Sequence, residues 1–590
     1  MDNVDLARVL GEIADLLEIE SGNPFRVRAY RTAARTIEAL GEPASAIAAR
    51  DPAALAELPG IGKDLAGKIV EILTTGDLAL RRELVTKVPA TLVTMMRVDG
   101  VGPKRAKLLY DELGLTTLHD VEAAARDGKL HSVRGIGEVL EKRILQGCAA
   151  ERARASRFRL AEADAHARPL VAYLKAAPEV AAIDVAGSLR RRRETIGDID
   201  VLVASTEAAA VARHFVSYPE VTKVLAHGET KCSVTLRSGM QVDLRIVAPD
   251  SYGAALHYFT GSKAHNIAIR TLGVKRDLKI SEYGVFRGER RIGGRTEEEV
   301  FRAVGLPWIP PELREDRGEI DAAREGRLPR LVELGDLRGD LHMHTDATDG
   351  KSTLREMVEA CAARGYGYLA ITDHTQALRM TGGMDRKGYL KQRRLIEAVR
   401  REFPGITILQ GAEVDILADG RLDLDEDTLA ELDVVIAAVH SKFGMTEAAM
   451  TERVLSALAH PRVNVLAHPT GRLLGEREPY AIDMAKIVRA ARERRVLLEI
   501  NAQPERLDLS DTLVRMARDS GARLVIDTDA HRASELELIR YGVDQARRGW
   551  CTAKDIANTR PLDELREMLR RAPAPLEKRL PRAAEARYRS

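Results

Sequence analysis

Short apolar segments that end beside metal-binding side chains constrain the fold of the C-terminal half more than any other feature of this sequence. The segments span residues 368–372, 407–411, 434–439, 463–467, 497–500 and 524–526. Helical stretches separate them, and this alternation predicts parallel β/α units that close into a barrel. The carboxyl ends of such strands meet on one face of the barrel, so side chains that follow them are expected to converge.

Nearly all of these segments are followed by an imidazole or a carboxylate. The candidate metal ligands are His342, His344, Asp349, His374, Glu413, His440, His468, Asp529 and His531. Nine ligands exceed what one ion needs, and the mixture of nitrogen and oxygen suits two or three manganese, zinc or iron ions. Asp373 is expected to support its neighbour His374 rather than to bind metal. His460, which precedes Pro461, is expected to be structural.

A second group of carboxylates lies in the first half, where 180–185, 199–204, 234–236 and 241–247 have strand character. Asp198 and Asp200 are two apart, so both face one side of a strand, and Asp243 lies on another. Like charges this close require a cation, and carboxylate oxygens suit Mg²⁺ or Mn²⁺. Two such ions would serve phosphoryl transfer.

The residues upstream of this group suit a phosphate ligand. Gly187 and Ser188 offer a backbone turn and a hydroxyl, and the arginine run 190–193 offers cationic density for a triphosphate.

Residues 1–150 have helical periodicity, interrupted by a repeated glycine–hydrophobic–glycine turn. Its glycines are Gly60 and Gly62, Gly100 and Gly102, and Gly135 and Gly137. Each turn precedes a basic amphipathic helix, and Lys104 follows the second copy. Glycine accepts positive φ, and the amides at a helix start favour an anion. The turns resemble the helix-hairpin-helix motif, which binds the DNA backbone without reading its sequence, with a monovalent cation as a candidate ligand.

The order Gly-Ser-x-Arg-Arg and Gly-Asp-Ile-Asp over 187–200 is the nucleotidyltransferase signature, and residues 1–315 resemble the family X DNA polymerases. Segments 258–266 and 281–284 resemble nucleotide-binding segments of the polymerase-beta branch. The resemblance implies that Asp198 and Asp200 bind both metal ions and that Asp243 helps to activate the primer 3′-hydroxyl. The implied nucleotide contacts are Gly187, Ser188, Arg191, Gly197, Tyr258, Phe259, Gly261, Asn266 and Arg270.

Among these contacts, Ser188 and Arg191 would hold the triphosphate. Tyr258, Phe259 and Gly261 would pack on the sugar, and Asn266 and Arg270 would face the minor groove. Lys68 occupies the position of the Schiff-base lysine of a deoxyribose-phosphate lyase. Leu80, however, stands where the family often has a supporting lysine.

In the second half, His-x-His, Thr-Asp-His-Thr, Gly-x-Glu, Val-His, Ala-His-Pro and Asp-x-His resemble the polymerase and histidinol phosphatase (PHP) domain over 336–560. The two halves in this order resemble bacterial family X DNA polymerases with a PHP domain. This resemblance implies a base-excision repair enzyme that fills gaps in DNA and degrades DNA as a metal-dependent 3′-5′ exonuclease. The alternatives are a polymerase whose PHP domain is chiefly a 3′-phosphatase or abasic-site endonuclease, and a DNA-end binding scaffold.

The expected fold is therefore multidomain: helical helix-hairpin-helix domains, an α+β nucleotidyltransferase palm and thumb, and a distorted (β/α) barrel. The expected bounds are a helical DNA-binding domain at 1–90, a fingers-like domain at 91–150, a palm at 151–260, a thumb-like domain at 261–315, a linker at 316–335 and the PHP domain at 336–575.

The composition of the chain does not narrow its function further. The net charge of +2, from 91 basic and 89 acidic residues, does not by itself indicate a nucleic-acid binder. Four scattered cysteines and no apolar run of about 18 residues favour a cytoplasmic protein without a membrane helix. The expected partners are gapped or primed DNA and dNTPs, and a monomer is favoured.

Overall fold

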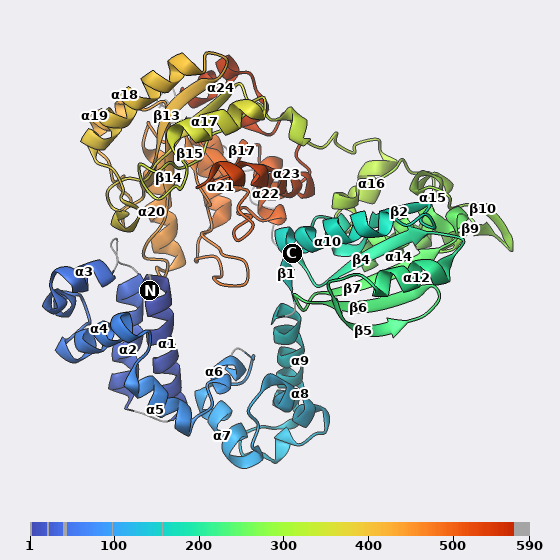
Figure 1. Cartoon of the computed structure of the whole chain (residues 1–590), viewed down its shortest axis with the longest axis horizontal. Helices are drawn as coiled ribbons and strands as arrows, with labels where there is room; N and C mark the ends of the chain where they lie inside the picture. Colours follow the sequence, from blue (N-terminus) through green and yellow to red (C-terminus); the bar gives the residue numbers. More distant parts are fainter. Residues whose placement is uncertain (1–2, 21–22, 39–43, 97, 156, 571–590) are drawn as a thin grey trace, which may run out of the picture.

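The computed structural model describes residues 3–20, 23–38, 44–96, 98–155 and 157–570. In Figure 1 the N-terminal helices lie below a barrel, and α9 (Glu138–Ala155) runs from them towards a separate sheet. Residues of α2 (Pro24–Glu38), among them Arg35, line one groove together with the barrel loop 442–445. The N-terminal helices therefore adjoin both the barrel and, through α9, the sheet.

The N-terminal part is helical, as its periodicity predicts. Apolar side chains at helical spacing, such as Leu6, Leu10, Ile13 and Leu17, are buried in one common core. The remaining helices are α1 (Asn3–Ile19), α3 (Ala44–Arg50), α4 (Lys63–Thr75), α5 (Ala79–Lys87), α6 (Thr91–Met95), α7 (Pro103–Leu113) and α8 (Leu118–Arg126).

A five-stranded sheet follows, with strand order β2-β4-β7-β6-β5. Its strands are β2 (Ala182–Val185), β4 (Asp198–Ala204), β5 (Val221–His227), β6 (Lys231–Leu236) and β7 (Gln241–Val247). The central pair β4 and β7 is parallel, and the other pairs are antiparallel. Two helices, α10 (Leu160–Lys175) and α12 (Ala208–Val216), pack their apolar residues into the core of this sheet.

A smaller unit continues the chain, seen at the right of Figure 1. It contains α13 (Tyr252–Thr260), α14 (Lys263–Val274), β8 (Lys279–Ser281), β9 (Gly284–Arg287), β10 (Arg290–Gly293) and α15 (Glu297–Ala303). Residues 316–335, expected to be a linker, do join the two halves, but they are not a solvated spacer. Within them α16 (Glu319–Arg324) buries Ile320 in the apolar core of this unit, and buried Glu319 contacts His265.

The C-terminal half is a seven-stranded parallel sheet in sequential order. Its strands are β11 (Gly339–Asp340), β12 (Tyr368–Ile371), β13 (Thr407–Asp415), β14 (Val434–Ala438), β15 (Val465–Leu466), β16 (Leu497–Asn501) and β17 (Leu524–Asp527). A parallel bridge between Met343 and Ala530 brings the two edges together, so the sheet is a nearly closed barrel. Strand residues are buried throughout, because helices cover the outer face.

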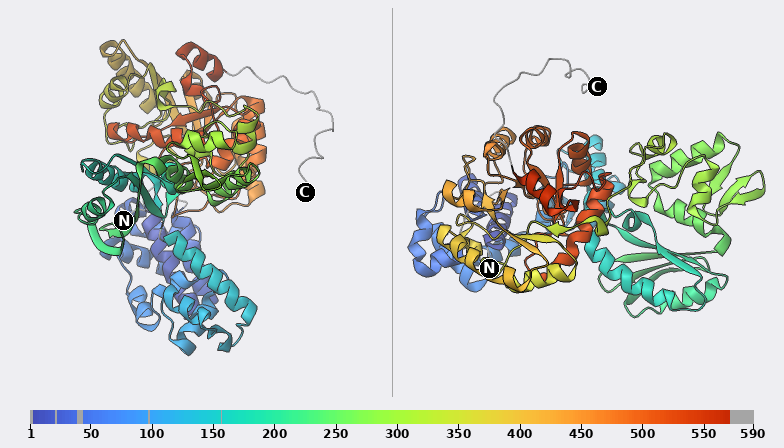
Figure 2. Two further views of the ribbon diagram at one scale, coloured as in Figure 1. Left: turned by 90° about the vertical axis from the view of Figure 1, so that its right-hand side faces the viewer. Right: turned by 90° about the horizontal axis from the view of Figure 1, so that it is seen from above.

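The helices that surround the barrel are α17 (Leu354–Ala363), α18 (Arg386–Glu402), α19 (Glu426–Glu431), α20 (Glu447–Ala459), α21 (Met484–Arg494), α22 (Asp511–Asp519), α23 (Ile539–Arg548) and α24 (Leu562–Leu569). Both views in Figure 2 show the five-stranded sheet against the barrel. Leu507 and Tyr541 of the barrel lie in the apolar core of that sheet, so the two units share a packed interface.

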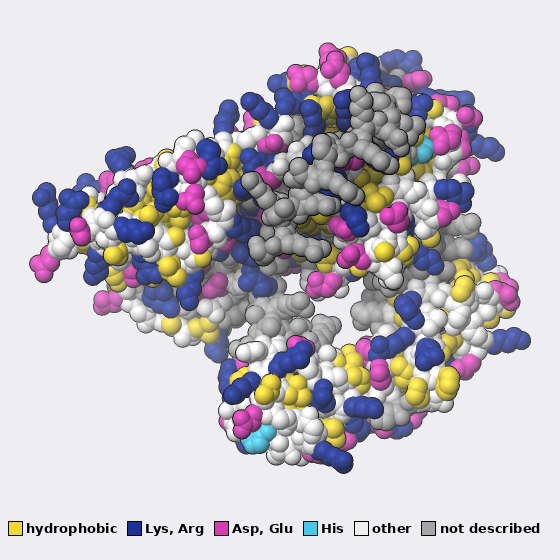
Figure 3. Space-filling view, turned by 180° about the vertical axis from the view of Figure 1, so that it is seen from behind, with side chains coloured by type: hydrophobic (Ala, Val, Ile, Leu, Met, Phe, Trp, Pro, Cys, Tyr) yellow, Lys and Arg dark blue, Asp and Glu magenta, His cyan; other side chains and the backbone are white. Residues whose placement is uncertain are grey.

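On the face shown in Figure 3, Lys and Arg side chains are interspersed with Asp and Glu, which agrees with a net charge near zero. Within the described residues, no helix is both long and apolar enough to cross a membrane. The four cysteines, all of them described, form no disulfide.

Candidate active sites

The first site lies where β4 and β7 run side by side. Asp200 on β4 is the register partner of Asp243 on β7, and Asp198 precedes Asp200 by two residues on the same face. Burial and the neighbouring Asp198 and Asp243 carboxylates raise the pKa of Asp200 to about 7. Burial and Asp243 likewise raise the pKa of Asp198. Three oxygen donors that repel one another fit divalent cations, which would remove the repulsion.

A glycine turn packs directly against these carboxylates. Gly187 has φ +58°, and a Cβ at this position would collide with the Asp200 carboxylate. Only glycine therefore allows the single helical turn α11 (Gly187–Arg190), which contains Ser188, to lie this close to the acidic residues.

The arginine run 190–193 meets several carboxylates, and the guanidiniums of 190–192 are hydrogen-bonded to them. The contacts are Arg190 to Glu297 at 2.8 and 2.9 Å, Arg191 to Glu315 at 3.0 Å, and Arg192 to Asp164 at 2.8 and 3.1 Å and to Asp544 at 2.8 Å. Arg193 lies at 3.8 Å from Glu315. Arg191 also donates to the backbone oxygen of Thr260 at 2.7 Å.

Residues 258–266 span the end of α13, the turn at 261–262 and the start of α14. The Asn266 amide donates to the backbone oxygens of Tyr258 at 2.6 Å and Gly261 at 3.3 Å. A Cβ at Gly261 would lie 2.5 Å from Asn266 Oδ1, so a larger residue there would displace the Asn266 side chain. Phe259 lies beneath the Arg245 guanidinium, which is 5.0 Å from the ring centroid. Gly197 lies directly before β4, and Arg270 is exposed on α14.

The second site lies at the carboxyl ends of the barrel strands. Eight of the nine candidate ligands fall into three groups, in each of which the donor atoms lie within 4.8 Å of one another. The groups are His344, Asp349, His374 and His531; His342, His344 and Asp529; and His374, Glu413 and His440. His344 and His374 each belong to two groups, so the three groups form one continuous cluster. The ninth residue, His468, places its Nε2 2.9 Å from Glu413 Oε1.

The donor atoms of this cluster face one another in a way that fits cations between them. His344 Nε2 lies 3.2 Å from His342 Nε2 and 3.1 Å from Asp529 Oδ1. The Nδ1 atoms of His344 and His468 are buried without a hydrogen-bond partner. Buried polar atoms without partners are costly, and imidazole nitrogens beside carboxylates are ligands for transition metals. The residues of the barrel therefore fit two or three such ions.

The electrostatics of the cluster reflect its dense packing. Burial and the positive charges of His531 and His374 lower the pKa of His344 to about 3, so this ring stays neutral, the form that binds metal. Burial opposes the charged form of His374, but Glu413 and Asp349 prevail and raise its pKa to about 10. Despite burial, the surrounding histidines hold the pKa of Glu413 well below its usual range.

Buried acids support these ligands from behind. Glu499 on β16 lies 2.6 Å from His342 Nδ1 and accepts the backbone amide of His468 at 2.6 Å. Asp373 accepts hydrogen bonds from Thr345, Thr348 and Gln392, all at 2.7 Å, rather than facing the cluster. Sequence reasoning missed Glu499, although an acidic residue inside the apolar segment 497–500 was the signal that could have found it.

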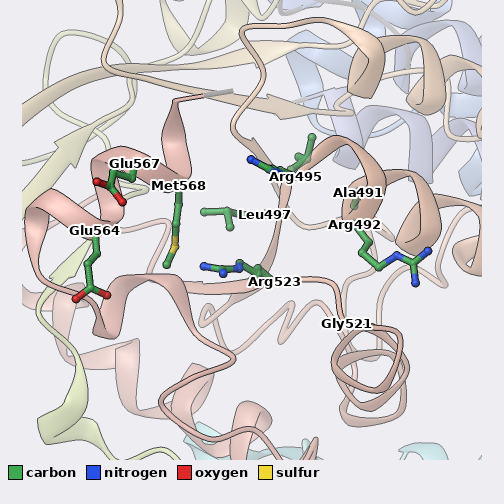
Figure 4. Close-up of a pocket in the computed structure, with 10 residues that line it drawn as sticks. Ala491, Arg492, Arg495, Leu497, Gly521, Arg523, Glu564, Glu567 and Met568 are labelled. Carbon is green, nitrogen blue, oxygen red and sulfur yellow. The ribbon is translucent and has the colours of Figure 1, made fainter. Parts of the chain in front are cut away.

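A pocket at the opposite end of the barrel is unrelated to this chemistry. It is lined by Arg492, Arg495, Leu497, Arg523, Glu564 and Glu567, as Figure 4 shows. Leu497 begins β16 and Arg523 precedes β17, so this pocket lies at the amino ends of the strands, away from the ligands.

The helical turns have the geometry that their glycines favour. Gly60, Gly100 and Gly135 have φ of +76°, +93° and +87°. Gly62 and Gly102 cap the starts of α4 and α7, Gly137 directly precedes α9, and Lys104 is exposed on α7. Lys68 on α4 is partly buried, and its Nζ lies 2.5 Å from Asp64.

Comparison with known proteins agrees with this arrangement. Family models for a helix-hairpin-helix domain match residues 1–78, a SAM-like helix-hairpin-helix tandem 92–150, a DNA polymerase beta thumb 255–315 and a PHP domain 340–503. The DNA polymerase/3'-5' exonuclease PolX of Bacillus subtilis is 38% identical over 97% of this chain and 100% of its own length. The chain belongs to the family X DNA polymerases that carry a PHP domain.

Other relatives of this family X polymerase match only about a third of the chain. A probable phosphatase of Edwardsiella ictaluri and one of Acetivibrio thermocellus are each 32% identical, over 33% of this chain and 80% of their own length.

Proposed function

We propose that this family X polymerase is a repair enzyme that fills short gaps in DNA and degrades DNA 3′ ends in its barrel. The observation that carries the first activity is the register pairing of Asp200 with Asp243, closed on one side by the Gly187 turn. The relative from Bacillus subtilis, which matches along its whole length, is named for both activities.

In the palm, Asp198 and Asp200 hold the ions, which we propose are Mg²⁺ or Mn²⁺. Asp243, fixed by a 2.8 Å hydrogen bond from Gln241, orients the primer hydroxyl. Ser188 and Arg191 hold the triphosphate. Tyr258, Phe259 and Gly261 pack against the sugar, and Asn266 and Arg270 face the minor groove of the nascent base pair. Divalent ions, when bound at either site, supply neutralisation of phosphate oxygens and activation of the attacking hydroxyl or water.

In the barrel, the nine ligands hold two or three ions of manganese, zinc or iron. Glu499 fixes the ring of His342, and neutral His344 contributes to two of the three ligand groups. No serine, cysteine or threonine nucleophile is needed, because the attacking group is water. The helix-hairpin-helix turns would hold the DNA backbone, with a monovalent cation as a candidate ligand.

Primer extension on a gapped duplex tests the first activity. The parent protein should add dNTPs, and the Asp198→Asn, Asp200→Asn variant should not, while the folding of both is compared by thermal unfolding. Extension that survives in the double variant would rule out this palm site.

The similarity of the barrel to probable phosphatases favours a second candidate, removal of a 3′-phosphate. Labelled single-stranded DNA that ends in a 3′-hydroxyl or a 3′-phosphate separates the candidates by product size. An exonuclease shortens the first substrate, whereas a phosphatase leaves it intact and converts only the second.

Lyase activity of Lys68 stays a prediction. Release of deoxyribose phosphate by the parent and by Lys68→Ala tests it, and equal rates would contradict it. The control is Lys63→Ala at the start of the same helix.

A further inference from the structure

A guanidinium from the barrel reaches the nucleotide-binding turn of the palm. Arg548, the last residue of α23, donates from Nη1 to the backbone oxygen of Arg191 at 2.7 Å. The same Nη1 contacts Glu315 Oε1 at 3.1 Å, and Nη2 contacts Asp511 at 2.6 Å. Because Asp511 lies on α22 of the barrel, this contact fixes the Arg548 side chain within the barrel, from which it reaches the palm.

This arginine is part of the buried interface. Its side chain is 3% exposed, against 12% for Arg191 and 8% for Glu315. A guanidinium keeps its charge in such surroundings and offers several donors in a fixed plane. Arg548 can therefore fix the position of the turn that ends at Arg191 through a backbone contact. Substitution of the Arg191 side chain would not reveal this effect.

Arg548 also changes the charge balance beside the turn. Glu315 Oε1 is shared by Arg191 Nε at 3.0 Å and Arg548 Nη1 at 3.1 Å. Burial acts against the ionised form, yet the two guanidiniums hold the pKa of Glu315 below its usual range. Four guanidiniums (Arg191, Arg193, Arg317 and Arg548) meet two carboxylates (Glu315 and Asp511) in this cluster, which leaves a net positive charge. Without Arg548 this excess would shrink, which would weaken the attraction of Arg191 for a phosphate.

We propose that Arg548 of the barrel is a positioning residue for the nucleotide triphosphate bound by the palm. It acts by holding the Arg191 backbone and by offsetting the charge of Glu315. This inference rests on the proposed polymerase function and adds a role of the barrel in nucleotide binding, separate from its own hydrolytic site.

Steady-state extension of a gapped duplex, with dNTP concentration varied, tests the proposal in the full chain. Arg548→Ala should raise KM for dNTP about tenfold, the loss of roughly one charge-assisted contact, with kcat within about twofold. Arg548→Lys keeps the charge but not the planar donors, and its KM for dNTP should lie between those of the parent and Arg548→Ala. Degradation of 3′ ends should match the parent in both, which also shows that the variants are folded.

Two further variants separate positioning from loss of the interface. Arg547→Ala breaks the adjacent contact of α23 with Glu312, at 2.7 Å, which does not reach the turn, and should leave KM unchanged. Arg548→Ala combined with Glu315→Gln also removes the carboxylate whose charge Arg548 offsets. This double variant should return KM for dNTP towards the parent value.

An unchanged KM in Arg548→Ala, an equal rise in Arg547→Ala, or no recovery in the double variant would each overturn the proposal. A parent protein that does not extend at all would instead contradict the polymerase function.

Discussion

Nε of Arg192 in the palm lies 2.8 Å from Oδ2 of Asp544 in the barrel, inside the interface between the two catalytic units. Arg192 also binds Asp164 of α10 at 2.8 Å. Removing one partner of a buried ion pair leaves the other charged and unpaired. Arg192→Ala should therefore lower the free energy of unfolding by about 3 kcal/mol, measured as a fall in the thermal unfolding temperature.

The control for this change is Arg168→Ala, which removes a second, 56% exposed arginine from the same Asp164 carboxylate. Exposed pairs contribute about 0–1 kcal/mol, so this variant should unfold close to the parent. Equal destabilisation by both substitutions would show that the interface contact with Asp544 is unimportant.

The raised pKa of Asp200 predicts a pH-dependent requirement for Mg²⁺. Burial and the adjacent carboxylates raise this pKa to about 7, so the group keeps its proton below that pH and must release it to bind a metal. The Mg²⁺ concentration that gives half-maximal extension should rise by up to about tenfold per pH unit below 7 and level off above it. A requirement that stays constant from pH 6 to 8 would contradict this assignment.

Ligands that belong to two groups should matter more for metal content than ligands that belong to one. His344 belongs to two groups, whereas His440 belongs to one. Metal analysis of purified protein should find two or three equivalents in the parent, with a larger loss in His344→Ala than in His440→Ala. His460→Ala, whose ring contacts Glu426 at 2.7 Å outside the cluster, is the matched control and should keep the parent content.

Glu499, which lies behind the ligand cluster, should affect the metal affinity of the cluster without binding metal itself. Glu499 holds His342 Nδ1 at 2.6 Å, and loss of such a supporting contact typically costs 10- to 100-fold in metal affinity. Glu499→Gln should therefore weaken Mn²⁺ binding by roughly that factor, as measured by titration, and leave primer extension unchanged. Binding equal to that of the parent would contradict a supporting role.

Much of this architecture is predictable from the sequence, because hydrophobic periodicity and strand-end positions are local properties. The barrel, the three carboxylates of the palm and the histidine cluster all come from such patterns. The partners of the arginine run do not. Arg192 meets Asp544 across 352 positions of the chain, and Arg191 meets Glu315 across 124. Only the packing of separate units creates these contacts, so the sequence alone does not show that carboxylates bind the arginine run. The burial of α16 within residues 316–335 is equally nonlocal, since it depends on the unit against which this helix packs.

The decisive measurement is one gapped-duplex assay with dNTPs and Mn²⁺ that follows extension and 3′ degradation together in the parent, Asp243→Ala and His344→Ala. If the two sites are independent, Asp243→Ala should abolish extension and retain degradation. His344→Ala should abolish degradation and retain extension. Loss of both activities in either variant, with normal thermal unfolding, would contradict the assignment of the two activities to separate palm and barrel sites.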